Sequence, residues 1–159
     1  MSLRTDLKKL RLRSGRERRL AMEAFILLGV MRAAILALPF RWIVRLLRLE
    51  AGEREAEGAV MDDPRIAGIG WAIAAAAART PWRSSCLAKA FCGSRMLGKR
   101  GIPSTLLLGV AKGEPGGGLL QAHAWLCCGT RTVTGEKGRE RFTLLAAFHP
   151  QPTGLSPKR

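Results

Sequence analysis

A cysteine at the predicted start of a helix is the feature that most constrains how this chain folds. Residues 83–91 read Arg-Ser-Ser-Cys-Leu-Ala-Lys-Ala-Phe, in which Ser84 or Ser85 can cap the exposed N–H groups of a helix that runs to about Arg100. Cys86 then lies at the positive end of the helix dipole, which stabilises a thiolate. The same N–H groups, together with a group near Trp82, can hold an oxyanion, so the position suits a nucleophile.

A histidine on a predicted strand lies downstream of this helix. His123, one of two histidines in the chain, is part of the predicted strand from Gln121 to Leu126. A cysteine followed by a distant strand histidine is the order in which cysteine acyl-transfer enzymes assemble a dyad. The alternative interpretation is structural: Cys86 as a core residue and His123 as a histidine packed beside Trp125.

Three runs of sequence carry a resemblance to a known family. They are Arg-Thr-Pro-Trp-Arg-Ser-Ser-Cys-Leu at 79–87, Leu-Gly-Lys-Arg-Gly-Ile-Pro-Ser at 97–104, and His-Ala-Trp-Leu at 123–126. In order and spacing, the chain from about Arg16 to Leu145 resembles the maturation protease, or B protein, of lasso-peptide biosynthesis. The resemblance implies an α+β fold with a transglutaminase-like, papain-related catalytic core, here preceded by a helical N-terminal arm. It also implies that Cys86 is the nucleophile and His123 its base.

The same resemblance implies a substrate and two partners. The substrate is the leader segment of a ribosomally made precursor peptide, cut to free an amine that a lasso cyclase joins to a side-chain carboxylate. Proteases of this kind work with a small leader-recognition domain, either fused or separate. Because residues 1–15 are too few to fold unaided, we expect a separate leader-recognition protein.

A predicted hairpin suggests a third catalytic residue. A two-residue turn at Gly129-Thr130 pairs Cys128 with Arg131, and continuing that register places His123 opposite Glu136. Directly opposed residues share a face with Cβ atoms about 5 Å apart, close enough for a carboxylate to orient an imidazole.

This carboxylate departs from the family pattern, which usually has an aspartate after the hairpin. The chain has no aspartate beyond Asp63, and Glu136 and Glu140 are the carboxylates that remain there. The alternative is that Glu136 is a solvated turn residue and that the enzyme works with a dyad or with Thr134.

The length of 159 residues and the apolar content of 47% predict a single domain. Residues 1–15 form a basic arm and 16–148 the catalytic domain, divided into a helical arm with linker (16–60) and a Cys/His core (61–148). The Pro-rich residues 149–159 are predicted to be a disordered tail. Within the domain we expect helices at 17–38, 40–49, 64–79 and 86–100, the third with Asp63 as its cap and Pro64 at its first position. We expect strands at 104–110 and 121–126, and a last strand or short helix at 141–148.

The net charge of +15 admits several partners. Residues 1–19 hold eight basic and two acidic side chains, but no zinc-finger or RNA-recognition motif accompanies them, so we expect no nucleic-acid partner. Glu23 and Arg32 disfavour a membrane-spanning helix at 20–38. Arg41, Arg45 and Arg48 recur at helical spacing, which leaves peripheral membrane contact open.

The cysteines indicate a reducing compartment. Cys86, Cys92, Cys127 and Cys128 follow no secretory segment, so we expect reduced thiols and a cytoplasmic location. There is no C-x-x-C spacing, and we expect neither a metal nor a cofactor. Two other functions fit the same residues: a transglutaminase-like acyltransferase, in which an amine replaces water, and a non-catalytic basic adaptor that binds a membrane surface or an acidic partner.

Overall fold

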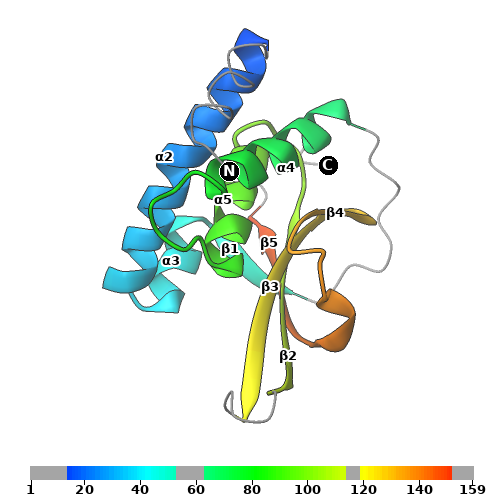
Figure 1. The fold of residues 1–159 in the computed structure, drawn as a ribbon. Helices are drawn as coiled ribbons and strands as arrows, with labels where there is room; N and C mark the ends of the chain where they lie inside the picture. Colours follow the sequence, from blue (N-terminus) through cyan, green and yellow to red (C-terminus); the bar gives the residue numbers. More distant parts are fainter. Residues whose placement is uncertain (1–13, 53–62, 114–118, 152–159) are drawn as a thin grey trace, which may run out of the picture.

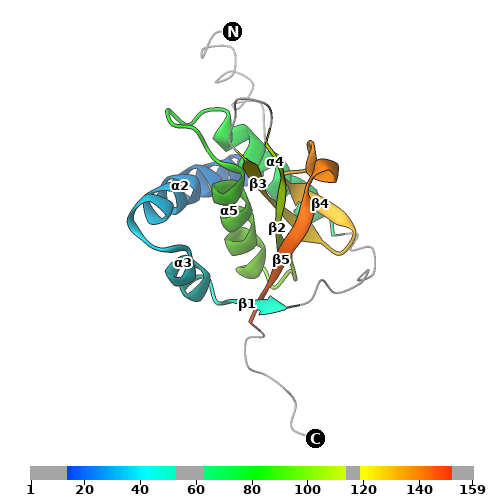
Figure 2. The same cartoon turned by 90° about the horizontal axis from the view of Figure 1, so that it is seen from below.

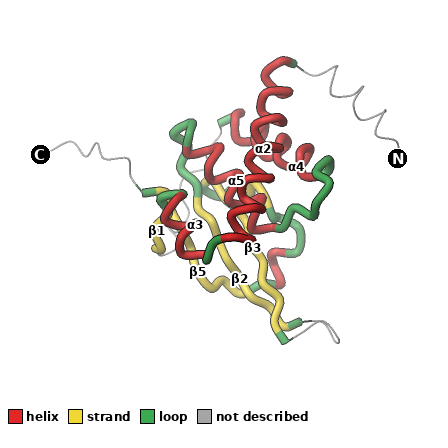
Figure 3. The backbone as a smooth tube through the Cα atoms, turned by 90° about the vertical axis from the view of Figure 1, so that its left-hand side faces the viewer, coloured by secondary structure: helices red, strands yellow, loops and turns green. Residues whose placement is uncertain are grey.

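A layer of helices packs on one face of an antiparallel sheet in the computed structural model, which describes residues 14–52, 63–113 and 119–151 (Figure 1). The helices are α2 (Gly15–Ala37), α3 (Phe40–Leu46), α4 (Pro64–Ala77) and α5 (Cys86–Gly98), with a 3-10 turn η1 (Arg139–Arg141). The strands are β1 (Leu49–Gly52), β2 (Thr105–Lys112), β3 (Leu120–Cys128), β4 (Arg131–Thr134) and β5 (Thr143–Pro150), in the sheet order β1-β5-β2-β3-β4. Figures 2 and 3 show the helices on one side of the strands. The predicted α+β class is confirmed.

Side-chain caps fix the helix starts that the sequence predicts. At α4, Asp63 Oδ1 accepts a 2.8 Å hydrogen bond from the Arg65 N–H, and Pro64 occupies the first helical position, where no N–H is needed. At α5, the Ser85 hydroxyl accepts from the Ala88 N–H at 3.2 Å. The predicted cap at Asp63 and the predicted start at Cys86 are therefore confirmed.

The end of the helical arm differs from the prediction. The second arm helix stops at Leu46, and Arg48 takes a positive φ of 52°, which turns the chain out of the helix. The next residues form β1, which pairs antiparallel with β5 from Leu49 opposite Pro150 to Gly52 opposite Ala147. The predicted linker therefore begins only after Gly52. The residues before it, Leu49–Gly52, form an edge strand because pairing with β5 provides hydrogen-bond partners for their backbone N–H and C=O groups.

The same pairing corrects the start of the C-terminal tail. His149 and Pro150, expected in a disordered tail, lie in β5 opposite β1. The N–H of the next residue, Gln151, donates a 2.8 Å hydrogen bond to the Arg48 carbonyl. Residues 1–13 of the predicted basic arm, 53–62 of the linker, 114–118 of the Gly-rich loop and 152–159 of the tail lie outside the described residues.

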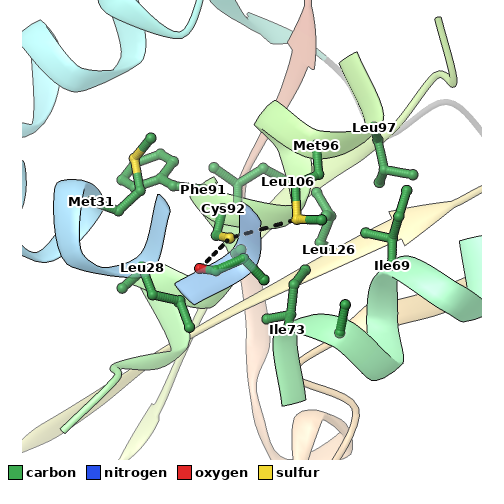
Figure 4. Close-up of a cluster of buried hydrophobic side chains, with 14 of the residues drawn as sticks. Leu28, Met31, Ile69, Ile73, Phe91, Cys92, Met96, Leu97, Leu106 and Leu126 are labelled. Carbon is green, nitrogen blue, oxygen red and sulfur yellow. Dashed lines mark hydrogen bonds between the residues drawn. The ribbon is translucent and has the colours of Figure 1, made fainter. Parts of the chain in front are cut away.

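Two apolar clusters occupy the two faces of the sheet. The main cluster joins α2, α4 and α5 to the sheet residues Leu106, Ala124, Leu126 and Cys128. Figure 4 shows part of it, with the Cys92 sulfur directed toward the Ala24 carbonyl at 3.7 Å. The second cluster lies on the other face and contains Leu107, Trp125, Cys127 and Ala147, with Phe142 packed against it. Cys127 and Cys128, neighbours on β3, therefore point to opposite faces of the sheet.

Helix α2 is long and apolar enough, by length and composition alone, to cross a membrane. A core helix of a water-soluble domain passes the same test. One side of α2 is in fact buried, with Ala21, Ala24, Leu28 and Met31 turned into the domain. The opposite side is exposed, as described below.

Candidate functional site

Cys86 is the first residue of α5, and it is the cysteine with partial exposure to solvent. The other cysteines, Cys92, Cys127 and Cys128, are buried, and all four are free thiols. Burial raises the pKa of Cys92 and of Cys128 to about 12, because a thiolate loses its hydration there. Cys86 therefore combines access to solvent with a helix N-terminus, the two properties that a thiol nucleophile needs.

The segment before Cys86 is held against α2 by side-chain packing. The Trp82 ring lies 5.9 Å from the Phe25 ring and contacts the helix at Gly29. Arg32 Nη1 donates a 3.1 Å hydrogen bond to the Arg83 carbonyl. These contacts position the entrance to α5 on the helical arm, which explains why the arm and the cysteine helix belong to one domain.

Trp82 also carries an unused hydrogen-bond donor. Its indole Nε1 is buried and, among the described residues, has no hydrogen-bond partner. The sequence predicts that a group near Trp82 helps to hold an oxyanion at Cys86, and this remains a prediction. The ring faces Phe25 and Gly29 of α2.

His123 lies on β3 with a defined ring orientation. Its Nε2 is 2.8 Å from the carbonyl oxygen of Gly135, and its ring lies 5.8 Å from Trp125 and 4.9 Å from Phe142. Because a carbonyl can only accept, Nε2 must carry the hydrogen in this bond. In the neutral ring Nδ1 then holds the lone pair, so Nδ1 is the nitrogen that can act as a base.

The hairpin register departs from the prediction before it reaches His123. Cys128 pairs with Arg131 as predicted, but an irregularity between Cys127 and Leu126 shifts the pairing so that Leu126 lies opposite Thr134. Strand β4 then ends. The predicted register, which placed Glu136 opposite His123, is wrong beyond Cys127, because a bulge changes the count of residues on one strand.

Gly135 can occupy this position because it has no side chain. Its φ is +78°, and a Cβ added there would lie 2.5 Å from the Ala124 carbonyl oxygen and 2.8 Å from the Trp125 Cβ. The turn therefore presses its backbone against β3, which brings the carbonyl to His123. Sequence reasoning missed this partner; the signal available was a glycine directly after a predicted strand.

The structure also shows where the two alternatives to Glu136, Thr134 and Glu140, lie. Thr134 is buried and packs near Gly93 of α5, so it belongs to the face that the helices cover. Its Oγ1 has no hydrogen-bond partner among the described residues. Glu140 lies in η1, on the side of the sheet away from α5 (Figure 2). The role of Glu136 as third catalytic residue stays a prediction.

Cys86 and His123 approach the sheet from different sides. Helix α5 packs on the face of Ala124 and Leu126, whereas His123 shares the opposite face with Trp125. Among the described residues no hydrogen bond or ion pair joins Cys86 to His123. The structure therefore does not bring the two predicted residues into contact, and the dyad stays a prediction that needs a functional test.

A cavity of about 380 Å³ lies elsewhere in the helical layer, between α2 and the start of α4. Its lining includes Arg16, Arg19 and Arg65, and Glu23, whose pKa is lowered by the hydrogen bond from Arg100. Neither Cys86 nor His123 lines it. In residues 14–52, 63–113 and 119–151, no three or more His, Cys, Asp or Glu side chains gather as metal ligands.

Comparison with known proteins places the chain in a family. Residues 27–147 match the family model described as the transglutaminase-like superfamily, and both Cys86 and His123 fall within that match. Searches of curated proteins and of solved structures gave no match. The family match covers most of the chain and agrees with a cysteine helix packed on an antiparallel sheet. This chain therefore belongs to the transglutaminase-like superfamily.

Proposed function

We propose that this protein is a cysteine peptidase that removes the leader from a ribosomally made precursor peptide in lasso-peptide biosynthesis. The observation that carries the proposal is Cys86, a free and partly exposed thiol at the first residue of α5, in a chain whose other cysteines are buried. The superfamily match supports cysteine-based acyl chemistry. The choice of a precursor peptide as substrate rests on the sequence runs around Cys86 and His123.

The chemistry follows from the two residues. His123, through Nδ1, takes the proton of Cys86, and the thiolate attacks the carbonyl carbon of the leader–core amide. The N–H groups at the start of α5 stabilise the tetrahedral oxyanion. The C–N bond then breaks as His123 returns the proton to the departing amine of the core peptide. Water, deprotonated by His123, hydrolyses the thioester and releases the leader carboxylate with the free thiol.

The direct test is removal of the thiol. Cys86→Ala should abolish leader removal from a precursor peptide, followed by mass spectrometry, while circular dichroism shows an unchanged fold. Cys92→Ala, which removes a buried thiol from the same helix, should retain cleavage. Release of core peptide by the Cys86→Ala variant would overturn the mechanism. Absence of cleavage by the wild type would instead favour a non-catalytic adaptor.

The contribution of the predicted third residue is tested with a matched pair of glutamates. Glu136→Gln should lower kcat more than Glu140→Gln, with an upper limit of about 10⁴ by analogy with catalytic triads. Both changes keep the size of the side chain and remove one charge from neighbouring turns. Equal rates for the two variants would contradict a role for Glu136 and leave the Gly135 carbonyl as the group that orients His123.

A second function is favoured by the family itself. In an acyltransferase the same thioester would be attacked by an amine in place of water, forming a new amide. Adding a primary amine to the cleavage reaction distinguishes the two, since the acyltransferase would yield the amide adduct of the leader as the main product. For the peptidase we expect the free leader carboxylate.

The proposal extends to the partners of the reaction. A separate leader-recognition protein would deliver the precursor, and a lasso cyclase would consume the amine that cleavage releases, all in the cytoplasm. Addition of the recognition protein should raise the cleavage rate at sub-saturating precursor. Tight binding of the leader peptide to the isolated chain, measured by calorimetry, would contradict this division of labour.

A further inference from the structure

Helix α2 presents an apolar stripe to solvent on the side that faces away from the domain. Met22, Ile26 and Val30, spaced four residues apart, are exposed by 62%, 58% and 52%. Exposed Ala33 and Ala37 continue the stripe to the end of the helix. Residues at this spacing share one face, so the stripe extends over about four turns. A surface helix of a water-soluble domain normally carries polar side chains there.

The stripe continues into α3 and the turn that precedes it. Exposed large apolar side chains are Leu36 near the end of α2, Leu38 in the turn, and Trp42 and Leu46 in α3. Of these, Leu36 and Leu46 are more than 70% exposed. Helices α2 and α3 form the outer part of the helical layer (Figures 2 and 3). We call the set of Met22, Ile26, Val30, Leu36, Leu38, Trp42 and Leu46 the α2–α3 face. Contiguous exposed apolar surface of this kind marks an interaction site.

The charges beside the α2–α3 face are positive. Arg41, Arg45 and Arg48 are exposed, and none has an ion-pair partner within the part of the chain that the structure describes. The Arg45 guanidinium lies 6.0 Å from the centre of the Trp42 ring. The acidic residue of mid-α2, Glu23, points elsewhere, because Arg100 and Lys99 hold its carboxylate. The face therefore combines apolar side chains, a tryptophan and unpaired arginines.

We propose that the α2–α3 face binds the surface of an anionic lipid membrane, with α2 lying in the plane of the interface. Apolar side chains enter the boundary of headgroups and acyl chains, Trp42 lies at the level of the headgroups, and the arginines contact lipid phosphates. Positive charge beside the apolar face matches a negatively charged bilayer. Because Ala24 and Leu28 are fully buried against the domain, α2 cannot span the bilayer while the domain stays folded.

The test uses the full chain and lipid vesicles. The protein should float with vesicles of mixed phosphatidylglycerol and phosphatidylcholine, and much less with phosphatidylcholine alone. Ile26→Gln should weaken binding about fivefold, because the change removes roughly half of the free energy that the isoleucine side chain gains on moving from water into the bilayer. Arg45→Gln should weaken it by a similar factor of about five and reduce the dependence on salt. Brominated lipids should quench part of the tryptophan emission, and Trp42→Phe should remove most of that quenching.

The matched control is Leu120→Gln, which removes an apolar side chain that is at least as exposed as Ile26, 69% against 58%, from β3. It should leave vesicle binding unchanged. Equal binding of the wild type to neutral and anionic vesicles, or undiminished binding by the Ile26→Gln and Arg45→Gln variants, would overturn the proposal. So would a stable dimer in sedimentation velocity that Ile26→Gln dissociates, since a second copy would then cover the face.

The outcome is independent of the proposed peptidase. None of the altered residues belongs to the candidate site, so cleavage of soluble precursor in the absence of lipid should be the same in every variant. A variant that loses vesicle binding but keeps cleavage shows that the α2–α3 face acts in membrane binding and not in catalysis. Absence of cleavage in the wild type, with vesicle binding retained, refutes the peptidase and leaves the membrane proposal standing.

Discussion

Replacement of Gly135 by alanine tests the turn that holds His123. The glycine has a φ of +78°, at which an alanine costs about 1–2 kcal/mol. Its new Cβ would also meet the Ala124 carbonyl oxygen at 2.5 Å and the Trp125 Cβ at 2.8 Å, and such overpacking typically costs about 1–3 kcal/mol. The smaller conformational freedom of the unfolded alanine chain offsets about 0.4–1 kcal/mol. Gly135→Ala should therefore lower the free energy of unfolding by about 1–5 kcal/mol.

Gly138 supplies the matched control for this prediction. Its φ is +77°, but a Cβ there would meet only the Arg141 side chain, at 3.8 Å and 3.9 Å. Gly138→Ala thus carries the backbone cost without the close contact and should lose about 1 kcal/mol. Urea unfolding followed by circular dichroism measures both variants. If Gly135→Ala is no less stable than Gly138→Ala, the turn does not press on β3 as described, and the Gly135 carbonyl is not the partner of His123.

Two further predictions concern the cysteines and an ion pair of the helical arm. At pH 7.5 iodoacetamide should add a single group, which peptide mass mapping should place on Cys86. Burial raises the pKa of the Cys92 and Cys128 thiols to about 12, so they should not react at this pH. Labelling of Cys92 or Cys128 before Cys86 would contradict the assignment. Glu23→Gln should lower stability by about 1–2 kcal/mol at neutral pH, since Arg100 Nη2 lies 2.7 Å from the carboxylate. The hydrogen bond from Arg100 holds the pKa of Glu23 below its ordinary value of 4.5, so the difference should shrink as pH falls below that value; a pH-independent difference would refute the ion-pair explanation.

The amino-acid sequence by itself determined where the helices begin and where the main turn lies. Asp63 and Ser85 cap α4 and α5 through hydrogen bonds that span two or three residues, and Gly129 forms the turn that pairs Cys128 with Arg131. These interactions involve neighbours in the chain, so the residue types specify them without knowledge of the rest of the fold. For the same reason, the position of Cys86 at the first residue of α5 could be predicted.

Only the tertiary structure decided what surrounds His123. The irregularity after Cys127 shifts the strand register, and no residue pattern in the hairpin announces it. The close approach of the Gly135 backbone to Ala124 and Trp125 is likewise visible only in the folded chain. The sheet edge was missed for a related reason: Leu49–Gly52 becomes a strand because β5 offers it partners about a hundred residues away. Interactions between distant segments set both the register and the face on which a side chain lies, since a one-residue shift moves a strand residue to the other side of the sheet.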